Sequence, residues 1–233
     1  MARLLLLAIL AAAPLARADA PTGSVKGTVL FEGEAPDRAK QDRVGDPKCG
    51  QNALHDAIVV TRGKLQGVLV RVKVGTAGTH AAPVKPVVID QRDCTYVPRV
   101  VGIVAGQKVA VRNSDDTTHS VWGTLAGKDV VNKMQVAKAP DVVIDPSAAK
   151  PGDVVELKCG VHAWMHAYVV VHDHPFFAVT GPDGSFSIEG LPQGKYTLEA
   201  WHPVLGTRTL AIEIGKLKRA NVTARFSYKA SER

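Results

Sequence analysis

Three side chains that bind soft metals lie within seven residues of one another. They are Cys159, His162 and Met165, in the run LKCGVHAWMHAYVVV. A thiolate, an imidazole and a thioether form a mixed nitrogen and sulfur ligand set that suits copper. The apolar residues on both sides of the run predict two strands joined by a short loop, and the loop would carry the ligands.

One ligand is missing from this set. A type 1 copper site has two imidazoles and a thiolate in a trigonal plane, with a weak axial thioether. His119 is the candidate for the second imidazole. It follows an expected strand at 108–111 and a polar turn, so we expect its ring to project from a loop toward Cys159.

Other kinds of site fit these residues less well. Structural zinc sites favour several thiolates and do not recruit a thioether. A cysteine hydrolase needs a base, a third residue that orients the base, and hydrogen-bond donors that stabilise an oxyanion. No signal for the third residue or for these donors accompanies Cys159 and His162. We therefore expect a protein that is not an enzyme. A buried structural cysteine with an unrelated surface histidine stays open as an alternative.

Three more histidines lie within nine residues after Met165. His166 comes directly after Met165 and is a candidate fifth or alternative axial ligand, but we expect it to point to the opposite face of the next strand. His172 and His174 have a spacing that puts both on one face of a strand, where a second metal could bind. Packing at a domain boundary or exposure to solvent is the simpler expectation for these two.

The chain contains three cysteines, an odd number. An unpaired thiol in an exported protein needs a role, and metal binding gives Cys159 one. Cys49 and Cys94 both lie in polar, turn-like contexts, so we predict a disulfide between them. The alternative is that both are extra metal ligands, which their distance in sequence from any histidine motif disfavours.

Alternating apolar residues predict an all-β protein. Turn signals such as Pro182-Asp183-Gly184 separate the runs. Helical periodicity is almost absent, and 130–139 is the only loose candidate. The expected strands are 25–31, 57–61, 67–74, 86–89, 100–104, 108–111, 153–158, 167–171, 186–188, 196–200, 209–214 and 220–226.

The ligand motifs resemble those of a known family. CGVHAWM is similar to the short ligand loop of amicyanin-like members of the cupredoxin (blue copper) family, and NSDDTTHSV resembles the family's first-ligand segment. The resemblance implies a Greek-key β-sandwich that binds one copper ion and transfers single electrons. It implies that the ligands are His119, Cys159, His162 and Met165. Two residues depart from the family pattern: Ser120 replaces an asparagine, and Ala163 stands where proline is common.

A second resemblance covers the C-terminal part. The sequence from Phe176 is similar to the carboxypeptidase regulatory-like domain, a small transthyretin-like β-sandwich with a carbohydrate-binding-like fold. That family opens with a strand like VKGTV at 25–29, which implies that the copper module is inserted into this sandwich. We expect a signal peptide at 1–18, an N-terminal strand region at 19–40, a copper domain at 41–174 and the regulatory-like sandwich at 175–229.

The N-terminus indicates where the protein acts, and the charge bears on what it binds. Arg3, an apolar run and small residues before position 18 are typical of a secretory signal peptide, so we expect export to the periplasm or the extracellular space. The formal net charge is +7, with dispersed basic residues and few aromatics, which predicts no nucleic-acid binding. No later segment could insert stably into a membrane.

These observations favour an exported type 1 copper protein that carries single electrons. A redox protein partner would dock near His162 and Trp164, because His162 is expected to be the ligand nearest the surface. The alternatives are a periplasmic copper carrier or storage protein, and a module that binds carbohydrate or mediates adhesion without metal. Glycan binding by the C-terminal sandwich has no specific support in the sequence.

Overall fold

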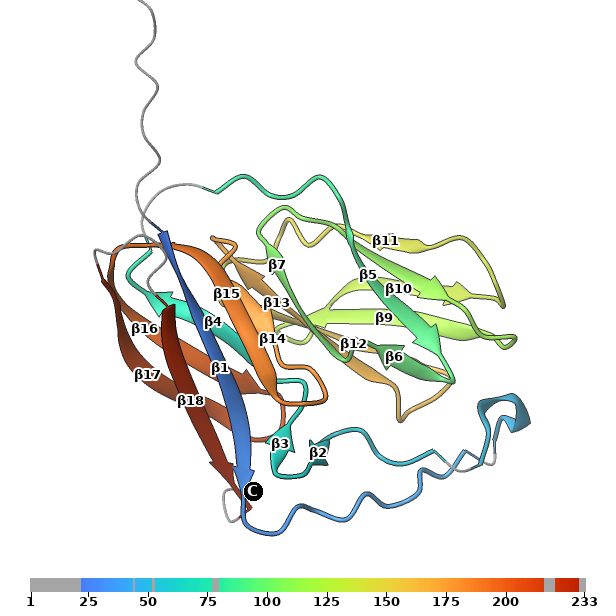
Figure 1. The fold of residues 1–233 in the computed structure, drawn as a ribbon. Helices are drawn as coiled ribbons and strands as arrows, with labels where there is room; N and C mark the ends of the chain where they lie inside the picture. The colour runs from blue at the N-terminus through green and yellow to red at the C-terminus, as the bar shows by residue number, and fades with distance from the viewer. Residues whose placement is uncertain (1–21, 44, 52, 77–79, 216–220, 231–233) are drawn as a thin grey trace, which may run out of the picture.

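The structure is a computed structural model that describes residues 22–43, 45–51, 53–76, 80–215 and 221–230. Across this part the chain is all-β, with eighteen strands and one short 3-10 helix. The strands form four sheets, which pack in pairs as two β-sandwiches (Figure 1). The expected signal peptide, 1–18, lies outside the described residues. No helix among the described residues has the length and apolar character to span a membrane.

The first sandwich contains the middle of the chain. One sheet has the order β11-β8-β5-β6, and the other has the order β10-β9-β12-β13-β7. The strands are β5 (Val87–Arg92), β6 (Thr95–Val97), β7 (Val100–Val104), β8 (Val109–Asn113), β9 (His119–Leu125), β10 (Lys128–Gln135), β11 (Val142–Ile144), β12 (Val154–Lys158) and β13 (His166–His172).

The second sandwich combines the two ends of the chain. One sheet has the order β15-β1-β3-β2 with β18 paired to β1, and the other has the order β14-β4-β16-β17. The strands are β1 (Thr22–Glu32), β2 (Val60–Thr61), β3 (Lys64–Leu65), β4 (Leu69–Val74), β14 (Phe177–Val179), β15 (Ser185–Pro192), β16 (Gly194–His202), β17 (Gly206–Ile214) and β18 (Asn221–Lys229).

Each sandwich has its own apolar core. In β12, Val155 and Leu157 alternate with less buried residues, so one face of the strand packs inside the first sandwich. In β15, Phe186 and Ile188 do the same in the second sandwich. A third, smaller cluster around Leu69, Val100 and Val170 joins the two sandwiches.

The first sandwich is inserted between strands of the second. β1 pairs with β15 and β18, so the N-terminal strand lies in a sheet with C-terminal strands. The expected copper domain at 41–174 is wrong at its N-terminal boundary, because β2, β3 and β4 belong to the second sandwich. Alternation shows that a strand has one buried face, but it does not show which sandwich buries that face.

The segment between β1 and β2 crosses to the first sandwich and returns (Figure 1). Residues 40–54, which we call the strap, fold back on themselves through a bridge between Lys40 and Leu54. The strap carries the 3-10 helix η1 (Pro47–Cys49).

The loose helix candidate at 130–139 is wrong. Most of this stretch is β10, which pairs with β9 at the edge of its sheet. The side chains of β10 are mostly exposed, so the strand lacks the alternation of buried and exposed residues that identifies strands in sequence.

Candidate metal centre

Three of the four predicted ligands meet at one end of the first sandwich. His119 is the first residue of β9, Cys159 directly follows β12, and His162 lies in the loop before β13. Because β9 and β12 are paired, residues at their ends lie close together. His119 Nδ1 is 2.9 Å from His162 Nδ1, and Cys159 Sγ is 3.9 Å from each of these nitrogens.

All four predicted ligands are buried. The exposed fractions are 0% for His119, 3% for Cys159, 2% for His162 and 1% for Met165. Met165 belongs to the same apolar core as Cys159, and its amide N–H donates to His162 O at 3.0 Å. The expectation that His119 projects from a loop is wrong, because His119 already belongs to β9 and pairs with Gln135 of β10.

The spacing of the three donor atoms fits one metal ion. Donors bound to a single ion at about 2.0 Å for nitrogen and about 2.3 Å for sulfur lie roughly 3 to 4 Å apart. The distances among His119 Nδ1, His162 Nδ1 and Cys159 Sγ fall in or close to this range. Two imidazole nitrogens and one thiolate, with the thioether of Met165 in the same buried core, favour copper over zinc. The residues therefore fit a copper ion.

The electrostatics of the site favour a thiolate. Burial by itself raises the pKa of Cys159, but hydrogen bonds from His119 and from the Ser120 amide outweigh it, and the pKa is lowered. Burial by itself lowers the pKa of His119, but Cys159 and Asp115 outweigh it, and the pKa is raised. A thiolate is the form of cysteine that binds metals. The pKa of His162 is lowered by burial and by the neighbouring His119.

A carboxylate contacts the far nitrogen of each imidazole. His119 Nε2 is 2.9 Å from Asp115 Oδ2, and His162 Nε2 is 3.2 Å from Asp46 Oδ2. A hydrogen bond at one ring nitrogen fixes the tautomer and leaves the other nitrogen for a metal. The two Nδ1 atoms that face each other are thus the ring nitrogens left available to a metal ion.

Ser120, where the resemblance led us to expect asparagine, spans the site. Its amide N–H donates to Cys159 Sγ at 3.3 Å, and its hydroxyl accepts from the Gly160 amide at 2.6 Å. Tyr96 supports the same strand ends, because its hydroxyl lies 3.1 Å from both Ser120 O and Lys158 O. These bonds tie the start of β9 to the end of β12.

Cys49 and Cys94 form a disulfide, and Cys159 is free. The disulfide lies beside the site, since Cys49 Sγ is 3.6 Å from His162 Nε2. The distance of Cys49 and Cys94 from the histidine motifs in sequence was therefore a poor guide to their distance from the histidines in space. Two further clusters of potential ligand atoms include Cys49 or Cys94, but sulfurs joined in a disulfide are not thiolates.

The remaining histidines lie outside this centre. His166 contacts Glu156 and the Ala163 carbonyl instead of the predicted ligands. His172 and His174 are buried where β13 meets the second sandwich, and His174 Nε2 is 2.9 Å from Val72 O. Neither belongs to a cluster of potential metal ligands in the part of the chain that the structure describes.

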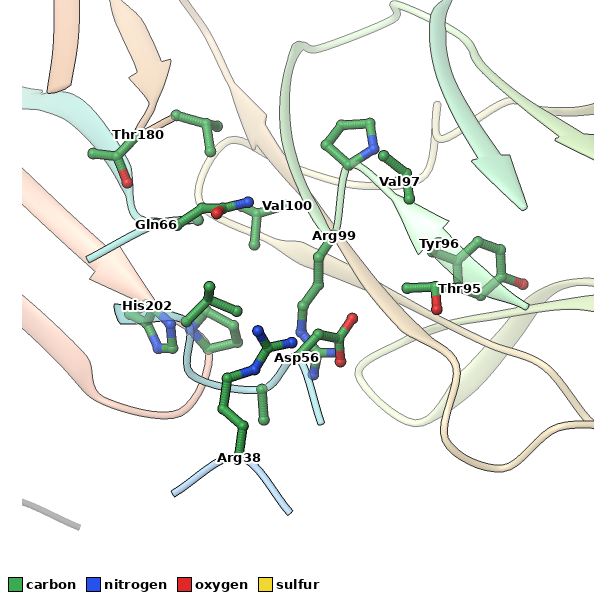
Figure 2. Close-up of a pocket in the computed structure, with 16 residues that line it drawn as sticks. Arg38, Asp56, Gln66, Thr95, Tyr96, Val97, Arg99, Val100, Thr180 and His202 are labelled. Atoms are coloured by element: carbon green, nitrogen blue, oxygen red, sulfur yellow. The ribbon is translucent and has the colours of Figure 1, made fainter. Parts of the chain in front are cut away.

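A cavity of about 370 Å³ lies between the two sandwiches and the residues that flank the strap on either side. Figure 2 shows Arg38, Asp56 and Arg99 pointing toward one another in it. Arg99 Nη1 is 2.8 Å from Asp56 Oδ1, and His202 also lines the cavity. The cavity holds no cluster of thiol and imidazole groups among its lining residues, so the centre around Cys159 is the better candidate for metal chemistry.

The two carboxylates were missed in the sequence. Asp115 lies four residues before His119, within a turn that was recognised only as polar. Asp46 lies in the strap. The Asp-Pro-Lys run before Cys49 signals a helix N-cap, and Asp46 caps η1 in addition to its contact with His162. Only the fold shows that this cap reaches His162, because 116 residues separate the two in sequence.

Comparisons with solved structures find cupredoxins. Amicyanin from Paracoccus versutus is 19% identical, and the match covers 44% of this chain and 97% of that chain with a TM-score of 0.33. A purple cupredoxin from Nitrosopumilus maritimus is 20% identical, and the match covers 36% of this chain and 98% of that chain with a TM-score of 0.31. No protein-family model and no curated protein matches the chain. At these identities and TM-scores, the ligand set and the function rest on the geometry of this chain's own residues.

Proposed function

We propose that this protein binds one copper ion through His119, Cys159 and His162, with Met165 as a weak axial ligand, and transfers single electrons. The observation that carries the proposal is the convergence of two imidazole Nδ1 atoms and one free thiol in a buried site. A bound copper ion would supply one-electron redox chemistry there.

The protein's own residues hold the donors with little freedom to move. Cys159 and His119 sit at the ends of paired strands, and Ser120 joins those ends. Each imidazole is hydrogen-bonded at its far nitrogen. Burial excludes water from all four side chains. A site whose donors are already in place needs little rearrangement when its charge changes, which favours electron transfer.

A copper carrier would use the same ligands, but it must release its metal. The strap covers His162, which leaves that ligand only 2% exposed. Burial of the ligand favours retention of the ion over delivery. We therefore expect bound copper to resist a strong chelator while it is oxidised and reduced reversibly.

The loop beside His162 is the proposed docking surface for a redox partner. Val161 and Ala163 are exposed, and Trp164 is partly buried. The Trp164 ring lies 5.0 Å from the His162 ring and donates from Nε1 to Cys94 O at 2.9 Å. Because His162 itself is buried, contact with a partner would pass through these neighbours. Weak electron-transfer complexes use small interfaces of this kind.

Export is part of the proposal. The Cys49–Cys94 disulfide supports it, because disulfides persist in oxidising compartments such as the periplasm. The second sandwich has no metal-ligand cluster among its described residues. We assign it no separate activity.

The experiment is to add Cu(II) to the metal-free protein and record its visible absorption and EPR spectra. We expect one copper per chain and an intense thiolate-to-copper band. Cys159→Ser should abolish the band. His166→Asn is the matched control, because His166 follows the same loop but contacts Glu156, and its spectrum should equal that of the wild type. A wild-type protein without the band would overturn the proposal.

A further inference from the structure

Two aspartates hold the candidate ligands in matching ways. Asp46 Oδ1 accepts from the Lys48 amide at 2.9 Å, and its Oδ2 accepts from Thr117 Oγ1 at 2.6 Å and contacts His162 Nε2. The carboxylate is therefore fixed in direction by the Lys48 amide and the Thr117 hydroxyl, with one oxygen against the imidazole.

Asp115 repeats the arrangement on the other imidazole. Its Oδ1 accepts from the Asp93 amide at 2.7 Å, and its Oδ2 accepts from the Cys94 amide at 2.9 Å and contacts His119 Nε2 at 2.9 Å. Its side chain is only 13% exposed. Each histidine thus faces one carboxylate, and that carboxylate has further donors that do not belong to the metal centre.

The disulfide connects the two carboxylate positions. Cys49 lies three residues after Asp46 in the strap, and the amide of Cys94 binds Asp115. Arg43, which is 2% exposed, adds a second connection: its Nη1 donates to Cys49 O at 2.9 Å and to Asp93 O at 2.7 Å. The strap and the turn at 93–95 are therefore held together beside the metal centre.

We propose that Asp46 and Asp115 are positioning residues that orient His162 and His119 and stabilise Cu(II) relative to Cu(I). This inference rests on the proposed function. A carboxylate hydrogen-bonded to a ligand imidazole makes that imidazole more basic and fixes its ring. Added negative charge beside the metal stabilises the more highly charged ion. The strap is then part of the metal centre, since it supplies one of the two carboxylates.

The test compares Asp46→Asn and Asp115→Asn with wild-type protein and with Asp116→Asn. Asparagine keeps one acceptor oxygen for the backbone amides but removes the negative charge. Asp116 is the matched control, because its side chain is 82% exposed and pairs with Lys138 instead of a histidine. It loses the same charge at a neighbouring position.

We expect Asp46→Asn and Asp115→Asn each to weaken Cu(II) binding by about 10- to 100-fold. Cu(I) binding should weaken less, so the reduction potential should rise. Asp116→Asn should stay within about twofold of the wild type, as expected for an exposed and screened charge. If the wild-type protein binds copper and both Asp46→Asn and Asp115→Asn bind Cu(II) as tightly as Asp116→Asn does, the inference is wrong.

A second measurement needs no copper. Nitrogen-15 NMR of the imidazole rings in the metal-free protein should show His162 protonated at Nε2 in the wild type and a mixture of tautomers in Asp46→Asn. An unchanged tautomer would contradict the positioning role. If the wild-type protein binds no copper at all, the proposed function fails, and this NMR comparison still decides whether Asp46 orients His162.

Discussion

The two sandwiches have buried polar groups of different kinds. At one end of the first sandwich, His119, Cys159 and His162 point donor atoms at one another. In the second sandwich, the buried polar groups are paired with the fold itself. Glu199 binds Arg71 and Lys73, and the hydroxyl of Tyr228 lies 2.8 Å from Ala200 O.

The difference shows where this chain has room for a ligand. Buried polar atoms normally have partners within the protein. In the second sandwich these partners are backbone carbonyls and salt bridges, which serve stability. In the first sandwich, the Nδ1 atoms of two histidines face each other and the free thiol of Cys159, which also accepts from the Ser120 amide. A metal ion is the partner that would satisfy all three.

The largest expected effect comes from the disulfide, which belongs to the first sandwich and its strap. Replacing both Cys49 and Cys94 by alanine should lower the free energy of unfolding by about 4 kcal/mol, from the loop entropy of a 45-residue separation. Copper binding should also weaken, because Asp46 is no longer tethered. Urea unfolding of the metal-free and copper-loaded protein measures both effects, and an unchanged midpoint in the two forms would contradict them.

The next effect tests a histidine of the second sandwich. Burial, with a smaller effect of Arg99, lowers the pKa of His202 to about 4. Because the unfolded chain takes up the proton near pH 6.5, stability should fall by about 3 kcal/mol as the pH drops from about 6.5 to about 4.

His202→Asn is the variant that isolates this effect. The asparagine oxygen can accept from the Val204 and Leu205 amides, as His202 Nδ1 does, but it does not titrate. The free energy of unfolding of this variant should depend less steeply on pH over that interval. Equal slopes in the two proteins would show that His202 is not the responsible group.

The smallest effect uses a matched pair of buried tyrosines. Tyr96 and Tyr228 are 1% and 0% exposed, and each hydroxyl lies near two backbone carbonyls. Changing either tyrosine to phenylalanine should lower the free energy of unfolding by about 1 kcal/mol. Only Tyr96→Phe should also alter the copper spectrum, because the carbonyls of Ser120 and Lys158 flank the ligands. Equal spectra for both variants would remove the proposed role of Tyr96.

Much of the fold follows from local patterns. Strands such as β12 and β15 were predicted because one face is buried and the other is not. Strand β10 was missed because it lies at a sheet edge with few buried side chains. The sandwich to which β4 belongs could not be predicted either, since its pairing with β14 and β16 joins residues more than 100 positions apart.

The candidate site was predictable to the extent that its residues form short motifs. Cys159, His162 and Met165 are close in sequence, and the odd number of cysteines indicated the Cys49–Cys94 disulfide. The carboxylate partner of His162 was not predictable, because the strap that carries Asp46 reaches His162 only after the chain has folded. The burial of His162 has the same cause.

The most direct test of the central claim is a crystal structure of the copper-loaded protein, with anomalous scattering recorded at the copper edge. We expect one strong anomalous peak between His119 Nδ1, Cys159 Sγ and His162 Nδ1. A copper peak at another place, such as beside His172 and His174, or no peak within the first sandwich, would contradict the proposed site.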